Sequence, residues 1–332
     1  MMLHNLLVAL VILAARAGAA DLLRLAETAE ALADQGRLSE AISAYEQALA
    51  VGAGSAKILN RLAGLYLQTE QLEKGGALLR RSLAENPAQA QVCFELAKVF
   101  QVLDQPDSAL VYARRAQELE PGSSGIAVMV GAIHLQAGHS ALAKVAFSHA
   151  LDLDPQNPEA HRFLGVYYTE GDSLAQAIAE FRRVTELLPE DLEAHNNIAF
   201  LLARRGQYPE ALAAYQQAES LAKDPRLRQA VRANREAVEA VMGGKMRARY
   251  ILVDTQARAA EVVAKHKAGE DFAGLAARFS KAPNAQDGGD TGFFSPGELL
   301  PDFEKAVQGL QVGQTCAPMV LPMGVVIIHR LN

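Results

Sequence analysis

The chain has 332 residues, half of them apolar, with a formal net charge of −6 and a pI near 5.8. This length leaves room for two or three domains. Lysine and arginine are scattered along the chain rather than clustered. Binding of nucleic acid needs a concentrated basic face that neutralises phosphates, so the composition excludes this class of partner.

The first 20 residues have the pattern of a secretory signal. An apolar run over residues 6–15 is followed by small residues, with cleavage expected after Ala19 or Ala20. The run is shorter than the roughly 20 apolar residues of a membrane span. No lysine or arginine precedes it, and Arg16 lies in the expected cleavage region. We expect export to a bacterial periplasm or the extracellular space, with an uncleaved N-terminal anchor as the alternative.

Four prolines recur at a constant interval. Pro87, Pro121, Pro155 and Pro189 are 34 residues apart, the period of a helix–turn–helix repeat. Counting back from them predicts six units, at residues 22–55, 56–89, 90–123, 124–157, 158–191 and 192–225.

Small residues occupy the eighth and twentieth positions of every unit. They are Ala29, Ala63, Ala97, Gly131, Gly165 and Ala199, and Ala41, Gly75, Ala109, Ala143, Ala177 and Ala211. Such residues let paired helices approach to the short end of the usual spacing of about 8–10 Å. The six copies in one register resemble the tetratricopeptide repeat family, which implies an all-α solenoid over residues 22–225. Residues 226–242 are predicted as a helix that caps the sixth unit, and Gly243-Gly244 as its end and a short hinge.

The inner helices of such a stack line a concave groove, which the resemblance assigns to protein partners. Asn60, Phe94, Lys98, Arg162 and Asn196 are its expected lining. This mixture suits an extended peptide, although each residue is also compatible with an ordinary solvated position. The complete set of Lys, Asn and Arg positions with which some family members hold a C-terminal carboxylate does not occur.

Histidines and cysteines indicate no metal site or cofactor. His161 and His195 occupy the fourth position of successive units, which are separated by about 8–10 Å. That is too far for two imidazoles to share a zinc ion bound about 2 Å from each nitrogen. We expect both to be structural. Cys93 falls on an inward repeat position and is predicted as core, and Cys316 lies far from it in the chain.

From Met246 the repeat pattern stops. Residues 247–253 are predicted as a strand, 256–267 and 271–279 as helices, 283–292 as a turn-rich loop, 300–307 as a short helix and 325–329 as a closing strand. These elements make a compact α+β domain of fewer than 90 residues.

Five segments of this domain resemble the parvulin (PpiC-type) peptidyl-prolyl isomerase family. They are Arg249–Val253, Asp271–Ser280, the Gly-Gly-Asp loop Gly288–Phe294, the Pro-x-Phe helix at Leu300–Phe303, and Gly324–Ile328. The resemblance covers residues 246–332 and implies the fold of a prolyl isomerase.

The polar site of that family is altered. Its members carry a histidine on the first strand, an aspartate or cysteine before the glycine loop and a histidine on the last strand, and the matching positions here are Tyr250, Ala282 and Val326. Only Tyr250 can donate or accept a side-chain hydrogen bond. His329 is no substitute, because three residues along a strand it faces the opposite side from Val326. Whether the domain is an enzyme is therefore left open.

The apolar part of the family's site is retained. The resemblance places Phe294, Leu299, Phe303 and Met323 around a substrate proline, and these residues are also compatible with a purely structural core. Three functions follow. The first is an exported chaperone or folding helper that binds extended, proline-containing or apolar segments with a degenerate isomerase site. The second is an active isomerase directed to clients by its groove, and the third is an assembly scaffold with a vestigial domain.

Overall fold

The computed structural model describes residues 20–51 and 55–332. The predicted signal, residues 1–20, therefore lies outside the described residues except for its last position. The chain divides into two compact units, Met1–Leu187 and Leu188–Asn332. Within the described ranges, every helix is too short or too polar to cross a lipid bilayer.

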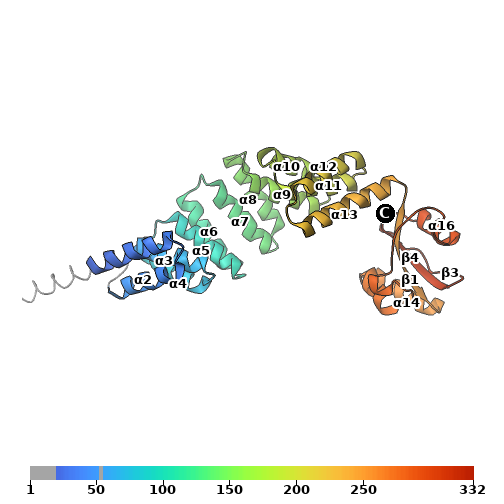
Figure 1. The fold of residues 1–332 in the computed structure, drawn as a ribbon, viewed down its shortest axis with the longest axis horizontal. Helices are drawn as coiled ribbons and strands as arrows, with labels where there is room; N and C mark the ends of the chain where they lie inside the picture. Colours follow the sequence, from blue (N-terminus) through green and yellow to red (C-terminus); the bar gives the residue numbers. More distant parts are fainter. Residues whose placement is uncertain (1–19, 52–54) are drawn as a thin grey trace, which may run out of the picture. The chain divides into compact units, whose positions relative to one another are not determined.

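The first of these two compact units is an array of paired helices (Figure 1). After a helix through residues 20–34, its helices are α2 (Leu38–Val51), α3 (Ala56–Gln68), α4 (Leu72–Glu85), α5 (Ala90–Val102), α6 (Pro106–Leu119), α7 (Ser124–Gln136), α8 (Ser140–Leu153), α9 (Pro158–Glu170) and α10 (Leu174–Leu187). The starts of α3, α5, α7 and α9 are the predicted starts of units two to five. Helices therefore recur in this part of the chain with a period of 34 residues.

The small residues of the repeat lie where the paired helices meet. The alanines at the eighth position are fully buried, and so is Cys93, as predicted. In two units a glycine faces a phenylalanine of the paired helix. A Cβ atom at Gly131 would lie 2.4 Å from the Phe147 ring, and one at Gly165 would lie 2.9 Å from the Phe181 ring. In these two units the ring occupies the space that an alanine methyl group fills elsewhere.

The second compact unit begins with three helices, α11 (Leu192–Arg204), α12 (Tyr208–Leu221) and α13 (Pro225–Met242). The side chain of Asp224 accepts hydrogen bonds from the first two free N–H groups of α13, those of Arg226 and Leu227. The predicted capping helix is thus present, and it packs against α12.

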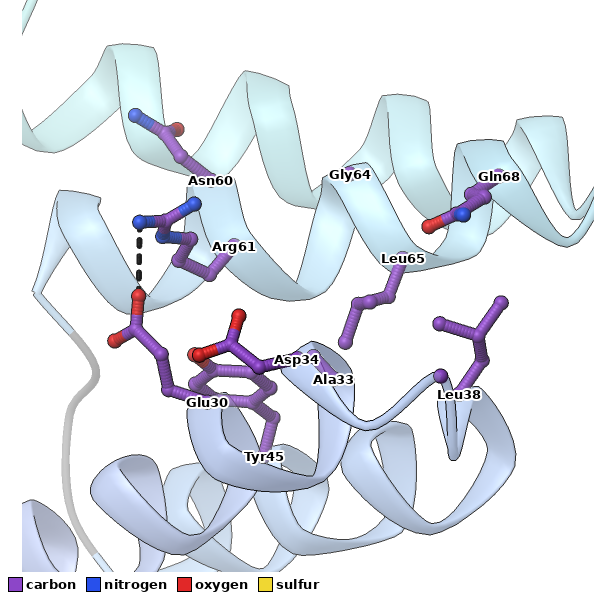
Figure 2. A pocket seen from close by; sticks show the side chains of 11 residues that line it. Glu30, Ala33, Asp34, Leu38, Tyr45, Asn60, Arg61, Gly64, Leu65 and Gln68 are labelled. Carbon is purple, nitrogen blue, oxygen red and sulfur yellow. Dashed lines mark ion pairs between the residues drawn. The ribbon is translucent and has the colours of Figure 1, made fainter.

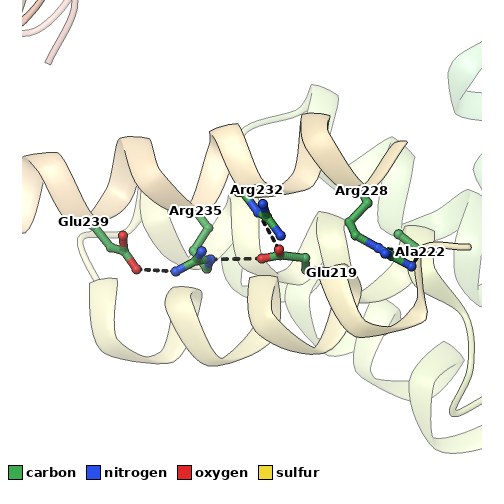
Figure 3. A network of polar contacts seen from close by, with 6 residues as sticks. All are labelled: Glu219, Ala222, Arg228, Arg232, Arg235 and Glu239. Atoms are coloured by element: carbon green, nitrogen blue, oxygen red, sulfur yellow. Dashed lines mark hydrogen bonds and ion pairs between the residues drawn. The ribbon is translucent and has the colours of Figure 1, made fainter. Parts of the chain in front are cut away.

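Charged side chains join α13 to α12 (Figure 3). Glu219 of α12 accepts from Arg232 at 2.7 Å and from Arg235 at 3.1 Å, and Arg235 also pairs with Glu239 at 2.6 Å. Arg228 donates to the carbonyl oxygen of Ala222 at the end of α12. The Arg232 hydrogen bond in particular holds the pKa of Glu219 below its usual value.

The Gly-Gly pair ends α13 in a defined turn. Gly244 has a φ of 75°, a left-handed conformation that favours glycine. Its N–H donates to Val241, and the N–H of Lys245 donates to Ala240. These are the two hydrogen bonds of a Schellman motif.

The terminal domain is a four-stranded antiparallel sheet with helices on both faces. Its elements are β1 (Met246–Val253), α14 (Gln256–Lys267), α15 (Phe272–Phe279), the short 3₁₀ helix η1 (Ala285–Asp287), β2 (Asp290–Phe294), α16 (Pro301–Gly309), β3 (Met319–Leu321) and β4 (Gly324–Arg330). The strand order is β2-β1-β4-β3. Every predicted helix and strand is present, whereas β2 and β3 were not predicted.

Alternate residues of β1 and β4 point to the two faces of this sheet. Val326 and Ile328 belong to the core under α16, which includes Phe303. Val325 and Ile327 belong to the core under α14 and α15. His329 contacts Phe272 of α15, so it lies on the face opposite Val326, as predicted.

The packing of Phe147 over Gly131 predicts opposite effects of two Gly→Ala substitutions. Gly131→Ala forces a methyl group into the ring and should cost about 1–3 kcal/mol. Gly64→Ala, where an added Cβ meets nothing within 4 Å, should stabilise α3 by about 0.5–1 kcal/mol. The urea midpoint of the helical circular dichroism signal measures both effects.

A double-mutant cycle identifies the cause. Phe147→Leu removes the ring, so adding Gly131→Ala to that variant should cost less than it costs in the natural chain. Equal costs in the two backgrounds would mean that the ring is not what requires a glycine.

Candidate functional site

The glycine loop of the terminal domain lies directly on β1 at Tyr250. Gly289 has a φ of 74°, and a Cβ atom on it would lie 2.2 Å from the carbonyl oxygen of Tyr250. The N–H of Tyr250 donates to the carbonyl of Gly289 at 2.9 Å. Only glycine permits this approach, so the loop fixes the backbone beside the altered site.

Tyr250 itself points to the face covered by α16. Its ring meets that of Phe303 edge-on, with centroids 5.6 Å apart. Its hydroxyl makes no hydrogen bond with any residue that the structure describes. Burial raises the pKa of this hydroxyl, so it stays protonated near neutral pH and can both donate and accept.

The other two altered positions are apolar and buried. Val326 lies opposite Leu252 on β1 and Met319 on β3, in the same cluster as Phe303 and Tyr250. Ala282 follows α15, and its backbone N–H donates to the hydroxyl of Ser280. Neither side chain can hydrogen bond to a substrate.

The four predicted pocket residues separate into two kinds. Phe294 and Phe303 are only 3% and 4% exposed, with their ring centroids 6.4 Å apart. Leu299 and Met323 are 37% and 45% exposed. The phenylalanines are therefore packed within the domain's own core, and the accessible apolar surface is that of Leu299 and Met323.

Glu304 positions the loop that carries Leu299, and the sequence analysis missed it. Its buried carboxylate accepts hydrogen bonds from the backbone N–H groups of Gly297, at 2.9 Å, and Leu299, at 2.8 Å. These bonds lower its pKa. The signal was an acidic residue in the first turn of a helix that begins with proline.

The aspartate of the glycine loop, Asp290, is also held by hydrogen bonds within the domain. Asp290 accepts two hydrogen bonds from the guanidinium of Arg247, at 2.9 and 2.6 Å. Burial alone would raise the pKa of Asp290, but the Arg247 bonds and the N–H of Gly292 lower it below its ordinary value. Asp290 thus ties β2 to β1.

A second polar cluster lies on the opposite face of the sheet. The rings of His266, Phe272 and His329 are in mutual contact, with centroids 5.2–5.6 Å apart. His266 Nδ1 bonds to the carbonyl of Glu270 at 3.0 Å, and His329 Nδ1 to the hydroxyl of Thr315 at 2.8 Å. This cluster joins the end of α14 to β4.

The predicted groove residues lie on four different helices. Phe94 and Lys98 come together on α5, with the ammonium 5.7 Å from the ring centroid. Asn60 of α3 donates to the side-chain oxygen of Gln89 at 2.9 Å. Arg162 on α9 and Asn196 on α11 are half-buried. The prediction that these five line one binding groove remains a prediction.

The two repeat histidines make the same backbone contact. His161 Nε2 bonds to the carbonyl of Pro155 at 3.1 Å and His195 Nε2 to that of Pro189 at 3.0 Å. His161 also bonds to Glu180 at 2.6 Å through Nδ1. Within the described ranges, no three His, Cys, Asp or Glu side chains are grouped to hold a metal ion.

The fold and these contacts agree with two protein families. Residues 251–332 match the family described as PPIC-type PPIASE domain. Residues 32–93, 128–191 and 192–225 match tetratricopeptide repeat families. The chain is a tetratricopeptide repeat protein whose repeats are followed by a parvulin-type (PPIC) domain.

Similar curated proteins match about a quarter of the chain. Foldase protein PrsA of Geobacillus kaustophilus is 44% identical over 85 residues, which are 25% of this chain and 30% of that protein. Chaperone SurA of Cupriavidus pinatubonensis is 39% identical over 93 residues, 25% of this chain and 19% of that protein. The chain thus spans less than a third of the length of either relative.

Among solved structures, that of Pseudomonas aeruginosa pilF is similar with a TM-score of 0.54 and 16% identity. It covers 66% of this chain and 99% of its own. This likeness supports the fold alone.

The histidine cluster predicts a loss of stability in mild acid. Burial lowers the pKa of His329, the charges of His266 and Arg249 lower it further, and Asp271 opposes them. The unfolded chain therefore binds this proton more readily, and stability falls as the pH drops below about 6.5. His329→Phe, which keeps a ring against Phe272, should flatten this dependence in calorimetric unfolding between pH 7.5 and 5.

The control is His149→Gln, at an exposed histidine of α8. It should leave the pH dependence of the natural chain unchanged. If His329→Phe follows the natural curve as well, another group is responsible for the loss.

Proposed function

We propose that this protein is an exported folding helper that holds extended or unfolded polypeptide. Its repeats provide a long binding surface, and its terminal domain contacts apolar or proline-containing segments. The similarity of a quarter of the chain to proteins named foldase and chaperone supports this function, as does the attachment of a PPIC-type domain to tetratricopeptide repeats. The apolar run over residues 6–15 supports export.

One observation favours binding over catalysis: two of the three polar positions of the family's site are buried apolar residues, Ala282 and Val326. Rotation about an X–Pro bond faces a barrier of about 18–20 kcal/mol, and no bond is made or broken. Polar groups directed at a changing charge distribution contribute about 2.7–4 kcal/mol each in comparable sites. Without two of them, the domain retains contacts for holding a segment but lacks the groups that would speed its rotation.

A second candidate function, an active isomerase, is favoured by Tyr250. Its hydroxyl is carried by the ring that contacts Phe303, and it makes no hydrogen bond with a residue that the structure describes. A single donor of this kind would support slow turnover. The two candidate functions therefore differ in the expected rate of prolyl isomerisation.

A protease-coupled assay with a proline-containing peptide separates them. The natural chain should turn over at least about 100-fold more slowly than a PPIC-type domain with the usual histidines and aspartate, since one lost group of this kind costs 10²–10³ in rate. In parallel, the chain should suppress aggregation of a denatured reporter enzyme, measured by light scattering. Turnover equal to that of the intact domain would contradict the binding function.

The exposed apolar residues of the terminal domain should carry its share of the binding. Leu299→Ser and Met323→Ser should weaken suppression of aggregation, because both side chains offer accessible apolar surface. Val320→Ser is the matched control in the same domain: this valine is 70% exposed, but it pairs with Val325, on the face of the sheet opposite Phe303. An equal loss in all three variants would indicate nonspecific adhesion, and no loss in the first two would remove these residues from the site.

A further inference from the structure

A cleft opens between the first helix, residues 20–34, and α3 (Figure 2). Its volume is about 730 Å³, and its lining includes Glu30, Asp34, Tyr45, Arg61 and Gly64. Figure 2 shows the side chains of the first four directed into the same space. All the lining residues belong to the first two repeats, so the cleft lies within the first compact unit, which ends at Leu187.

The charges of this cleft do not balance. Arg61 pairs with Glu30 at 2.8 Å. Asp34, on the next turn of the same helix as Glu30, makes no hydrogen bond or ion pair with any residue in the described ranges. The cleft thus holds two carboxylates and one guanidinium, and it has an excess negative charge.

Tyr45 supplies an independent sign of a ligand. Its side chain is 3% exposed and lines the cleft. Its hydroxyl makes no hydrogen bond with a residue that the structure describes, which is unusual for a buried tyrosine. Burial raises the pKa of the Tyr45 hydroxyl, the charges of Glu30 and Asp34 raise it further, and that of Arg61 lowers it. The hydroxyl therefore lies close enough to these three side chains to interact with their charges.

The side-chain amide of Asn60, which also lines the cleft, is held by Gln89, and its oxygen is enclosed. The side-chain amide of Gln89 donates to Ser82 and Asn86, so its oxygen faces Asn60. The Asn60 amide nitrogen donates to that oxygen at 2.9 Å. Its own oxygen is left without a donor among the described residues.

Apolar surface adjoins Asp34 and Tyr45. Ala33, Leu38 and Leu65 also line the cleft. At Gly64 an added Cβ would meet nothing within 4 Å, so the surface of α3 is open there. Acceptors and negative charge beside such a surface match a side chain with a long aliphatic stem and a cationic head that only donates.

We propose that this cleft binds a lysine or arginine side chain that projects from an extended client polypeptide. The stem lies over Gly64 and Leu65, and the cationic head lies beside Asp34 and the Tyr45 hydroxyl. This inference rests on the proposed function and adds a sequence preference to it. The repeats then bind client segments that contain a basic residue more tightly than segments that do not.

Fluorescence anisotropy of the full chain with three labelled peptides tests this site. The peptides share one extended sequence and differ at a central position that is Lys, Gln or Glu. The Lys peptide should bind about fivefold more tightly than the Gln peptide, the upper range for one partly exposed ion pair, and the Glu peptide should bind most weakly. Asp34→Asn should remove most of the preference for Lys, and Asp34 is exposed, so the fold should be unaffected.

Filling the cleft gives a second variant. Gly64→Phe should weaken binding of the Lys peptide, whereas Gly64→Ala should retain it. Gly125→Phe on α7 is the matched control, because a Cβ there also meets nothing within 4 Å. It should leave the preference for Lys intact.

Equal affinity for the three peptides, or a full Lys preference in Asp34→Asn, would overturn the site. If the natural chain still suppresses aggregation in that case, the proposed function stands and only the cleft is wrong. If the chain binds none of the peptides and suppresses no aggregation, the proposed function fails as well.

Discussion

Close contact between paired helices is the constraint on which the repeat array depends. Each pair meets at small residues, and where the eighth residue of the repeat is glycine an aromatic ring rests on the bare helix backbone, as Phe147 does on Gly131. Core positions of this kind tolerate little change in volume. The fixed contact and the 34-residue period place equivalent residues of successive helices on one surface. The cleft at Gly64 is one consequence, because it lies between the first helices of two adjacent units.

The terminal domain keeps the framework of a parvulin-type domain while changing what the framework presents. The glycine loop still lies on β1, and Asp290 and Glu304 still fix the loops around the site through Arg247 and the backbone of Gly297 and Leu299. These groups are already satisfied within the domain. Of the three positions that the family resemblance assigns to polar groups, only Tyr250 is polar. Under the proposed function, such a domain holds a segment by its shape and apolar surface rather than by polar chemistry.

The sequence predicted the regular parts of the fold well. The starts of α3, α5, α7 and α9 were predicted to the residue, since proline spacing and small residues are local signals that recur. The helix α14 was also predicted with its observed bounds, Gln256–Lys267. The strand β2 was missed because Gly-Gly-Asp-Thr-Gly is typical of a turn, and it becomes a strand only through its pairing with β1. The three-residue strand β3 likewise exists only beside β4.

For the site, the sequence determined which chemical groups are present and which face of the sheet each occupies. It showed that Ala282 and Val326 cannot hydrogen bond through their side chains and that His329 cannot replace Val326, because the period of a strand is fixed at two residues. Only the tertiary structure decided accessibility: that Phe303 is enclosed by Tyr250 and its neighbours while Leu299 is exposed, and that Asp34 and Tyr45 meet in one cleft. Accessibility depends on side chains brought together from distant segments, and a linear pattern does not contain those contacts.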